Sequence, residues 1–161
     1  MILGWFVNHF VLRTICQEEG INIRKYHPEV TLVFGTMGGI FLMGNTANLD
    51  TGYQNTKLHV FCAGRFFIFT ILAQIYNTII VALLSKKTKL ISKWNLYLKY
   101  FVLILFLLQV IDSAIKGISW LEFSGENSDK GKFLEWTMTA TVIIMFMSIG
   151  YDANRFELGY V

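Results

Sequence analysis

Several ionisable side chains stand within or at the edges of long apolar stretches of this 161-residue chain, and four of them could form one polar cluster: His59, Arg65, Asp112 and Glu135. A guanidinium can pair with a carboxylate or bind an anionic lipid headgroup, and an imidazole beside a carboxylate can act as an acid/base pair. An isolated charge in hydrocarbon is costly, so intramembrane ionisable residues usually have partners and functions. These residues are therefore the first candidates for a site.

The stretches that carry them predict four membrane-spanning helices. Each has close to the ~20 residues that an α-helix needs to cross about 30 Å of hydrocarbon. Segment 101–108 (FVLILFLL) is apolar on all sides, as a lipid-exposed helix is. With 54% hydrophobic and 16% charged residues, the composition excludes an ordinary soluble domain. The four stretches are residues 30–49, 58–84, 97–118 and 133–151.

Residues 1–27 are predicted to form a separate interfacial segment. Residues 1–12 are too short to span the bilayer, and Arg13 follows the apolar stretch, whereas a signal peptide would carry its charge first. The alternative is the stub of a fifth span packed against a partner subunit. We expect an all-α polytopic membrane protein, with a four-helix transmembrane domain over residues 28–161 and a short N-terminal interfacial helix. The apolar residues spaced around that short helix are Trp5, Phe6, Phe10 and Leu12.

Lysine and arginine in short loops resist translocation and therefore predict orientation. One side of the predicted bundle receives Arg13, Arg24, Lys25, Lys86, Lys87, Lys89, Lys93, Lys99 and Arg155. The other receives Lys57, Lys130 and Lys132, diluted by acidic residues. Both termini are therefore predicted on the cytosolic or matrix side. The net charge of +3 belongs to these loops and requires no nucleic-acid partner. Segment 85–94 could touch anionic headgroups, although such loops more often only set topology.

A depth argument brings the four site residues together. Arg65 follows Leu58 by seven positions, which places it about 10 Å into its span at 1.5 Å per residue. Asp112 and Glu135 belong to the spans that leave and enter on that same side, and His59 stands at comparable depth. We expect Arg65 to pair with Glu135 or Asp112. The cluster either fixes helix register or binds a lipid headgroup.

Other residues in the spans indicate helix packing. Gly35 and Gly39 have the small-xxx-small spacing that lets two helices approach closely. Gln74, Asn77 and Gln109 are expected to form hydrogen bonds between helices rather than a transport path.

Enzyme and cofactor signatures are absent from the sequence. It holds no HExxH, Gly-rich phosphate loop or GxSxG motif, and neither Cys16 nor Cys62 is spaced for a metal site. His59 is the single histidine in a predicted span, which excludes a b-type haem with two facing imidazoles. We predict no enzyme, no metal and no cofactor, and allow structural phospholipids. Acyl transfer by His59 and Glu135 is the weak alternative.

The segment 134–158 (LEWTMTATVIIMFMSIGYDANRFEL) resembles the last span of the DRAM/Frag/Sfk family of polytopic membrane proteins. In that family a glutamate and an aromatic residue open the final helix, here Glu135 and Trp136, and an aromatic-aspartate pair closes it. The resemblance covers about residues 25–158. Its other matches are Tyr151 and Asp152 at the end of the last span, Leu58 and His59 at the start of the second, Lys86 and Lys87 in the basic loop, and Ala47 and Asn48 after the Gly-rich first span.

The resemblance implies a six-span fold, of which this chain is expected to hold the last four spans. Relatives include lysosomal autophagy modulators, lipid-remodelling factors for glycosylphosphatidylinositol anchors and regulators of phosphoinositide synthesis, most of them not established catalysts. His59 and Glu135 match recurring polar positions of the family, whereas Arg65 and Asp112 follow from depth alone.

Three functional interpretations stay open. The favoured one is a non-catalytic accessory or scaffold subunit of a larger membrane complex, such as one of the mitochondrial inner membrane, with other integral membrane subunits as partners. The alternative is a lipid-handling or lipid-remodelling protein with a headgroup site at the outer face. The third is a free-standing endomembrane regulator. In each case the chain is a multi-pass protein among membrane lipids.

Overall fold

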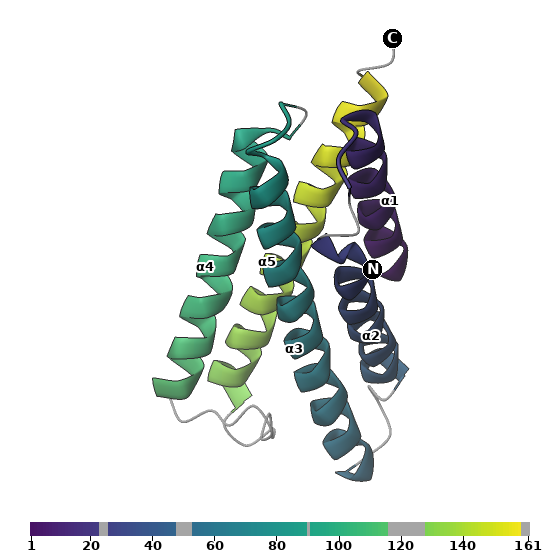
Figure 1. Ribbon diagram of the computed structural model, residues 1–161. Helices are drawn as coiled ribbons and strands as arrows, with labels where there is room; N and C mark the ends of the chain where they lie inside the picture. Colours follow the sequence, from purple (N-terminus) through teal and green to yellow (C-terminus); the bar gives the residue numbers. More distant parts are fainter. Residues whose placement is uncertain (23–25, 48–52, 90, 116–127, 159–161) are drawn as a thin grey trace.

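The computed structural model describes residues 1–22, 26–47, 53–89, 91–115 and 128–158. Side chains are described within these ranges except at positions 53–57, 60, 113–115, 128–135 and 152–158. Over this part of the chain the structure is entirely helical and contains no strand, which confirms the predicted all-α class. The helices are α1 (Ile2–Glu18), α2 (Pro28–Ala47), α3 (Tyr53–Leu84), α4 (Lys93–Ile115) and α5 (Ser128–Leu158) (Figure 1).

Three of the described helices contain segments long and apolar enough to cross a membrane, namely Pro28–Ala47, Phe61–Leu84 and Lys93–Asp112. They correspond to the first three predicted spans. The apolar part of α5 that is described, Trp136–Tyr151, is shorter. The structure therefore supports a multi-pass membrane protein, and the fourth span stays a prediction.

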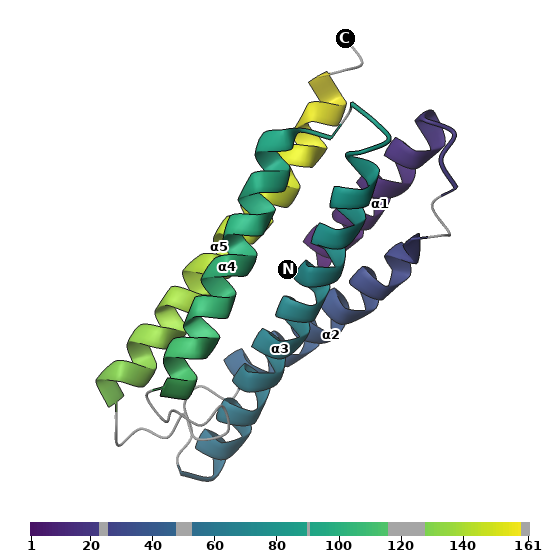
Figure 2. The same ribbon diagram turned by 60° about the vertical axis from the view of Figure 1, so that its left-hand side comes forward.

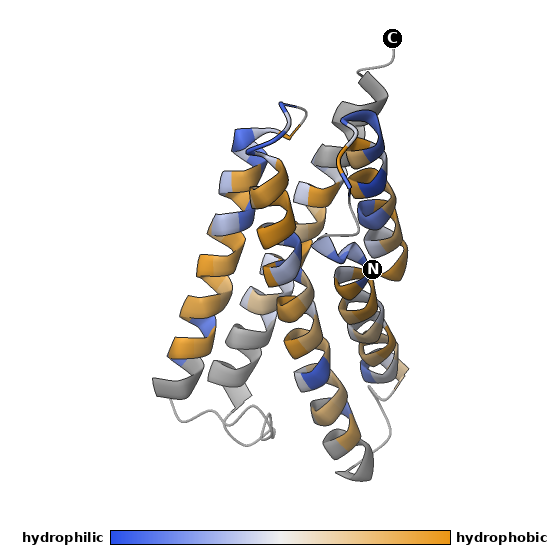
Figure 3. Ribbon diagram, viewed as in Figure 1, coloured by the Kyte–Doolittle hydropathy of each residue, from blue (hydrophilic) through white to orange (hydrophobic). Residues whose placement is uncertain are grey.

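Two helical hairpins organise the bundle, and α3 of the first hairpin packs against α4 of the second. The α2 and α3 helices run antiparallel on one side, and α4 and α5 run antiparallel on the other (Figures 1 and 2). We call the end where α2 ends and α3 begins the acidic end, after the acidic residues of the nearby loops. The opposite end, where α3 ends and α4 begins, is the basic end. Hydrophilic residues gather at the basic end, and apolar residues dominate the middle of α3 and α4 (Figure 3).

Helix α1 packs into this bundle beside α2, α3 and α5 and runs toward the basic end (Figure 1). Of the residues expected around an interfacial helix, Trp5 and Leu12 are buried against protein, whereas Phe6 and Phe10 point outward. One face of α1 therefore belongs to the protein core. The interfacial placement of residues 1–27 stays a prediction.

The end of α1 is a Schellman motif. Gly20 has φ +62°, a left-handed conformation that costs glycine little because it has no Cβ. The amide of Gly20 donates to Gln17 O at 3.2 Å, and the amide of Ile21 donates to Cys16 O at 2.7 Å. These bonds satisfy carbonyls at the end of the helix and turn the chain back toward α2. Pro28 then occupies the first turn of α2, where its missing N–H is not needed.

Two buried clusters hold the helices together. The larger one lies in the middle of the bundle, where Trp5 of α1 and Phe67 of α3 pack with Phe106 of α4 and Met145 of α5. The smaller one lies at the basic end and joins Leu12 and Ile15 of α1 to Leu84 of α3. The side chains that face outward are also largely apolar, as expected for helices surrounded by lipid.

Candidate functional site

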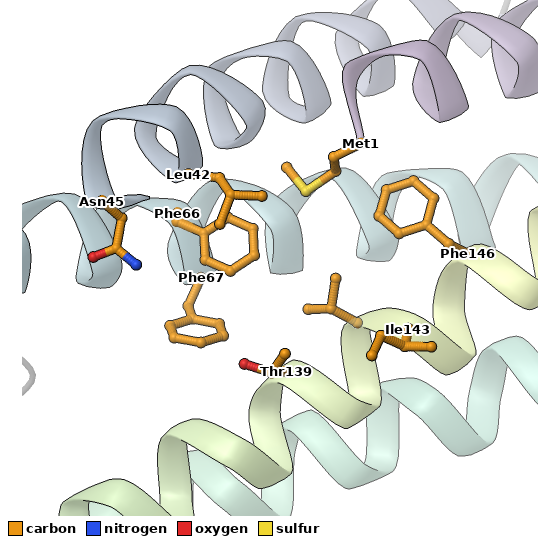
Figure 4. Close-up of a pocket in the computed structure, with 9 residues that line it drawn as sticks. Met1, Leu42, Asn45, Phe66, Phe67, Thr139, Ile143 and Phe146 are labelled. Carbon is orange, nitrogen blue, oxygen red and sulfur yellow. The ribbon is translucent and has the colours of Figure 1, made fainter. Parts of the chain in front are cut away.

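A cavity of about 270 Å³ lies between the start of α1, the last turns of α2, and helices α3 and α5, in the half of the bundle toward the acidic end (Figure 4). Its walls are mostly apolar. Polar groups enter it from Asn45 of α2 and Thr139 of α5. The apolar lining residues are Met1, Leu42, Phe66, Phe67, Val142, Ile143 and Phe146.

Asn45 connects this cavity to His59, one of the residues singled out by the sequence. The Nδ1 atom of His59 lies 3.2 Å from the main-chain oxygen of Asn45. A carbonyl oxygen can only accept a hydrogen bond, so Nδ1 of His59 is the donor in this contact. The side-chain oxygen of Asn45 is buried and accepts no hydrogen bond from the described residues. The polar part of the cavity wall therefore has one acceptor, the side-chain oxygen of Asn45, that no described residue uses.

Arg65 lies on the outward face of α3 and does not line the cavity. Its neighbours along that face, at helical spacing, are the exposed residues Phe61, Ile68 and Leu72. The guanidinium carbon lies 5.1 Å from the centroid of the Phe61 ring. Because Phe61 is one turn nearer the acidic end, the side chain extends toward that end, as a snorkelling arginine does.

The other two members of the predicted cluster are placed only in part. Asp112 is half-buried near the end of α4, and among described residues no ion pair joins it to Arg65. The side chain of Glu135 lies outside the described residues, so its pairing with Arg65 stays a prediction. The structure thus brings His59 to Asn45 and directs Arg65 outward, and it does not join Arg65 to Asp112.

The glycines of α2 form two close interfaces. Cβ atoms added at Gly35 and Gly39 would clash with the side chains of Trp5 and Ile2 of α1. A Cβ at Gly38 would lie 2.9 Å from the Thr70 hydroxyl, and one at Gly44 would lie 3.0 Å from the Cys62 sulfur, both on α3. The Gly35 and Gly39 pair thus lies at the contact with α1, and the neighbouring glycines lie at the contact with α3.

Hydrogen bonds between helices were expected at three polar residues, and the structure shows them at two. Asn8 Nδ2 donates to Asn77 Oδ1 at 3.1 Å, and Gln109 Nε2 donates to Thr141 Oγ1 at 3.0 Å. These bonds confirm the interhelical role predicted for Asn77 and Gln109. Gln74 instead donates to Thr78 of its own helix at 3.4 Å, since α3 places the two side chains one turn apart.

Two buried polar residues escaped the sequence reasoning. Lys99 was counted among the loop lysines, but the structure places it in α4, fully buried, with Nζ 3.2 Å from Ser148 Oγ of α5. Asn95 precedes it by one turn and is 2% exposed. Their spacing of four residues, which puts both on one helix face, was the available signal. Among the residues that the structure describes, no His, Cys, Asp and Glu cluster could hold a metal ion.

Comparison with known proteins identifies a family. The model of the Frag1/DRAM/Sfk1/Cwh43P N-terminal domain matches residues 1–155. The match includes α1, whereas the resemblance noted in the sequence covered about residues 25–158. No curated protein and no solved structure matches the chain.

Proposed function

Because the chain belongs to the Frag1/DRAM/Sfk1/Cwh43P family of membrane proteins, we propose that it is a lipid-handling protein whose cavity receives part of a membrane lipid. An acyl chain fits between α2, α3 and α5, and the polar end of the lipid meets Asn45 and His59. The cavity near the acidic end is the observation that supports this proposal.

The chemistry of the cavity suits a ligand with an apolar body and a polar end. Ligand sites are typically apolar concavities with a few placed polar groups, and a volume of about 270 Å³ is close to the lower end of their range of roughly 300–1,000 Å³. That volume holds part of an acyl chain rather than a whole lipid. The buried Asn45 oxygen can accept a hydrogen bond from a hydroxyl or amine of a lipid headgroup.

The cavity favours this role over an accessory or scaffold subunit. Outward apolar faces such as those of α4 suit a bilayer and a partner subunit equally well, whereas an apolar cavity between helices that opens beside Ile143 can also hold part of a lipid. Arg65 adds to the lipid role from outside. It lies among apolar residues and reaches toward the acidic end, where phosphates of the surrounding headgroups would neutralise it.

The proposed role is non-catalytic. General acid/base catalysis by His59 needs a proton-accepting partner or substrate within hydrogen-bond reach. The described partner of its Nδ1 is the main-chain oxygen of Asn45, which orients the ring and cannot take up a proton. His59 is therefore proposed to position the part of the cavity wall that Asn45 forms. Glu135 is proposed to lie at the same end, as the predicted headgroup cluster requires.

A cavity-filling substitution tests the proposal. Val142→Phe adds a ring where the cavity wall is buried, and it should reduce the number of lipids that stay bound after purification in mild detergent, measured by native mass spectrometry. Val33→Phe is the matched control, because Val33 points outward on α2. Melting temperatures of both variants separate lost binding from lost folding. Equal lipid retention by wild type and a folded Val142→Phe variant would overturn the proposal.

A further inference from the structure

A second concave surface lies at the opposite end of the bundle, between α4 and α5. This groove has a volume of about 660 Å³ and shares no residue with the cavity near the acidic end. Its walls are apolar and rich in aromatic rings. It is lined by Trp94, Asn95, Tyr97, Leu98, Phe101, Met147 and Tyr151.

Asn95 is the polar residue in this lining, and it is nearly completely buried. Its side chain is 2% exposed, and neither Nδ2 nor Oδ1 has a hydrogen-bond partner among the described residues. A buried amide without partners costs free energy, so such a group in a folded protein calls for a ligand, a water or a functional role. The amide offers both a donor and an acceptor at the groove.

Positive charge surrounds the same end of the groove. Lys99 is fully buried one turn after Asn95 on the face of α4 that meets Ser148. Of the exposed lysines at positions 86, 87, 89 and 93, Lys93 directly precedes Trp94, whereas Nζ of Lys87 lies 5.6 Å from the centroid of the Tyr26 ring. Trp94, which is 78% exposed, and Tyr97 stand beside them, as aromatic residues do at the border between headgroups and hydrocarbon. Aromatic rings and positive charges therefore meet at one level.

We propose that this groove binds an anionic phospholipid from the leaflet at the basic end of the bundle. One acyl chain lies along Tyr97, Phe101 and Met147, and the phosphate region lies beside Asn95 and Lys93. This site is separate from the proposed cavity ligand, because it lies at the other end of the bundle and shares no lining residue with the cavity, although α5 contributes to both.

The charge pattern identifies the ligand. An apolar helix from a partner could cover the rings, but it would add no negative charge beside the lysines. An anionic phospholipid supplies an acyl chain for the apolar wall, acceptors for the amide and a negative charge for the lysines. It is therefore the one class of occupant that satisfies all three features.

Fluorescence quenching by brominated lipids tests the groove directly. The full chain is placed in vesicles that contain either dibrominated phosphatidylserine or phosphatidylcholine with the same dibrominated chains. The difference between wild type and Trp94→Phe isolates the signal of Trp94. We expect phosphatidylserine to be preferred about fivefold or more, since one lysine near an anionic surface contributes about that factor. Trp136 is the internal control, and the difference between wild type and Trp136→Phe isolates its signal. It is exposed on α5 toward the acidic end and should show no such preference.

The variant Asn95→Leu should reduce the preference at Trp94 while leaving the signal of Trp136 unchanged. Equal quenching of Trp94 by both lipids in the wild type would overturn the proposal, because the groove would then hold bulk lipid. Absent quenching by either lipid would also overturn it and would indicate a protein segment or a second copy of the chain in the groove. Neither result depends on the Val142→Phe experiment, so the two proposals can fail independently.

Discussion

The helices of the two hairpins are held to their neighbours by different interactions. Helix α2 presents glycines to α1 and α3, so that backbones approach closely and Trp5 lies directly over Gly35. Helices α4 and α5 instead exchange hydrogen bonds between polar side chains, at Lys99 with Ser148 and at Gln109 with Thr141. In lipid, apolar surface alone gives little reason for helices to associate, so close packing and interhelical hydrogen bonds replace it. Close packing at glycines therefore characterises the first hairpin, and hydrogen bonds between polar side chains characterise the second.

The largest loss of stability is expected where the close packing at a glycine of α2 is disrupted. Gly35→Ala places a Cβ against the Trp5 ring, which is fully buried and cannot move aside cheaply, and should destabilise the fold by about 1–3 kcal/mol. Unfolding in a detergent titration measures the change. Gly150→Ala is the matched control, because its Cβ would meet no atom and alanine favours a helix by about 1 kcal/mol. Equal stability of the two variants would show that the close approach to α1 is unimportant.

The hydrogen bond between Lys99 and Ser148 tests the contribution of polar side chains to the second hairpin. Ser148→Ala removes a hydrogen-bond acceptor of Lys99 and should cost about 1–3 kcal/mol, because a buried donor then loses one partner. Ser85→Ala serves as comparison, since that half-buried hydroxyl donates only to Ala82 O of its own helix. Thermal unfolding in nanodiscs would reveal the difference. A neutral result at Ser148 would leave Gln109 and Thr141 as the polar bond that matters in this hairpin.

A smaller effect is expected for the hydrogen bond between two amide side chains that joins α1 to α3 of the first hairpin. A double-mutant cycle with Asn8→Ala and Asn77→Ala should give a coupling energy of about 0.6 kcal/mol, typical of such bonds in membrane proteins. The same cycle at Gln109 and Thr141 provides the comparison. Similar values would show that the hairpins differ through glycine packing and Lys99 rather than through neutral hydrogen bonds. A coupling energy near zero between Asn8 and Asn77 would show that this hydrogen bond does not stabilise the packing of α1 on α3.

The smallest change in stability is expected at Arg65. Its described contact is an exposed cation–π pair with Phe61, so Arg65→Leu should alter the free energy of unfolding by only about 0.5 kcal/mol. The same titration measures it, with Ile68→Leu on the same outward face as control. A loss of several kcal/mol would instead indicate a structural ion pair, with Glu135 as the predicted partner.

The sequence by itself was enough to determine the helical class, the membrane environment and the family. These properties follow from long apolar runs and local motifs, which are readable without knowing which helices touch. An observed helix lies over each predicted span, although residues 48, 49 and 116–118 of the predictions lie outside the described residues. Helices α3 and α4 begin before the predicted starts, because a helix can continue into polar flanks such as those before Leu58 and Tyr97.

Only the tertiary structure decided the direction in which each polar side chain points. Depth predicted that Arg65 pairs with Glu135 or Asp112, but depth fixes one coordinate, and the rotation of α3 about its axis directs Arg65 outward; the pair with Glu135 stays a prediction. The same rotation turned Lys99 of α4 inward onto Ser148, although its charge and its place near a loop resembled those of its exposed neighbours. Side-chain direction depends on which helices surround each face, and those contacts join residues far apart in the chain.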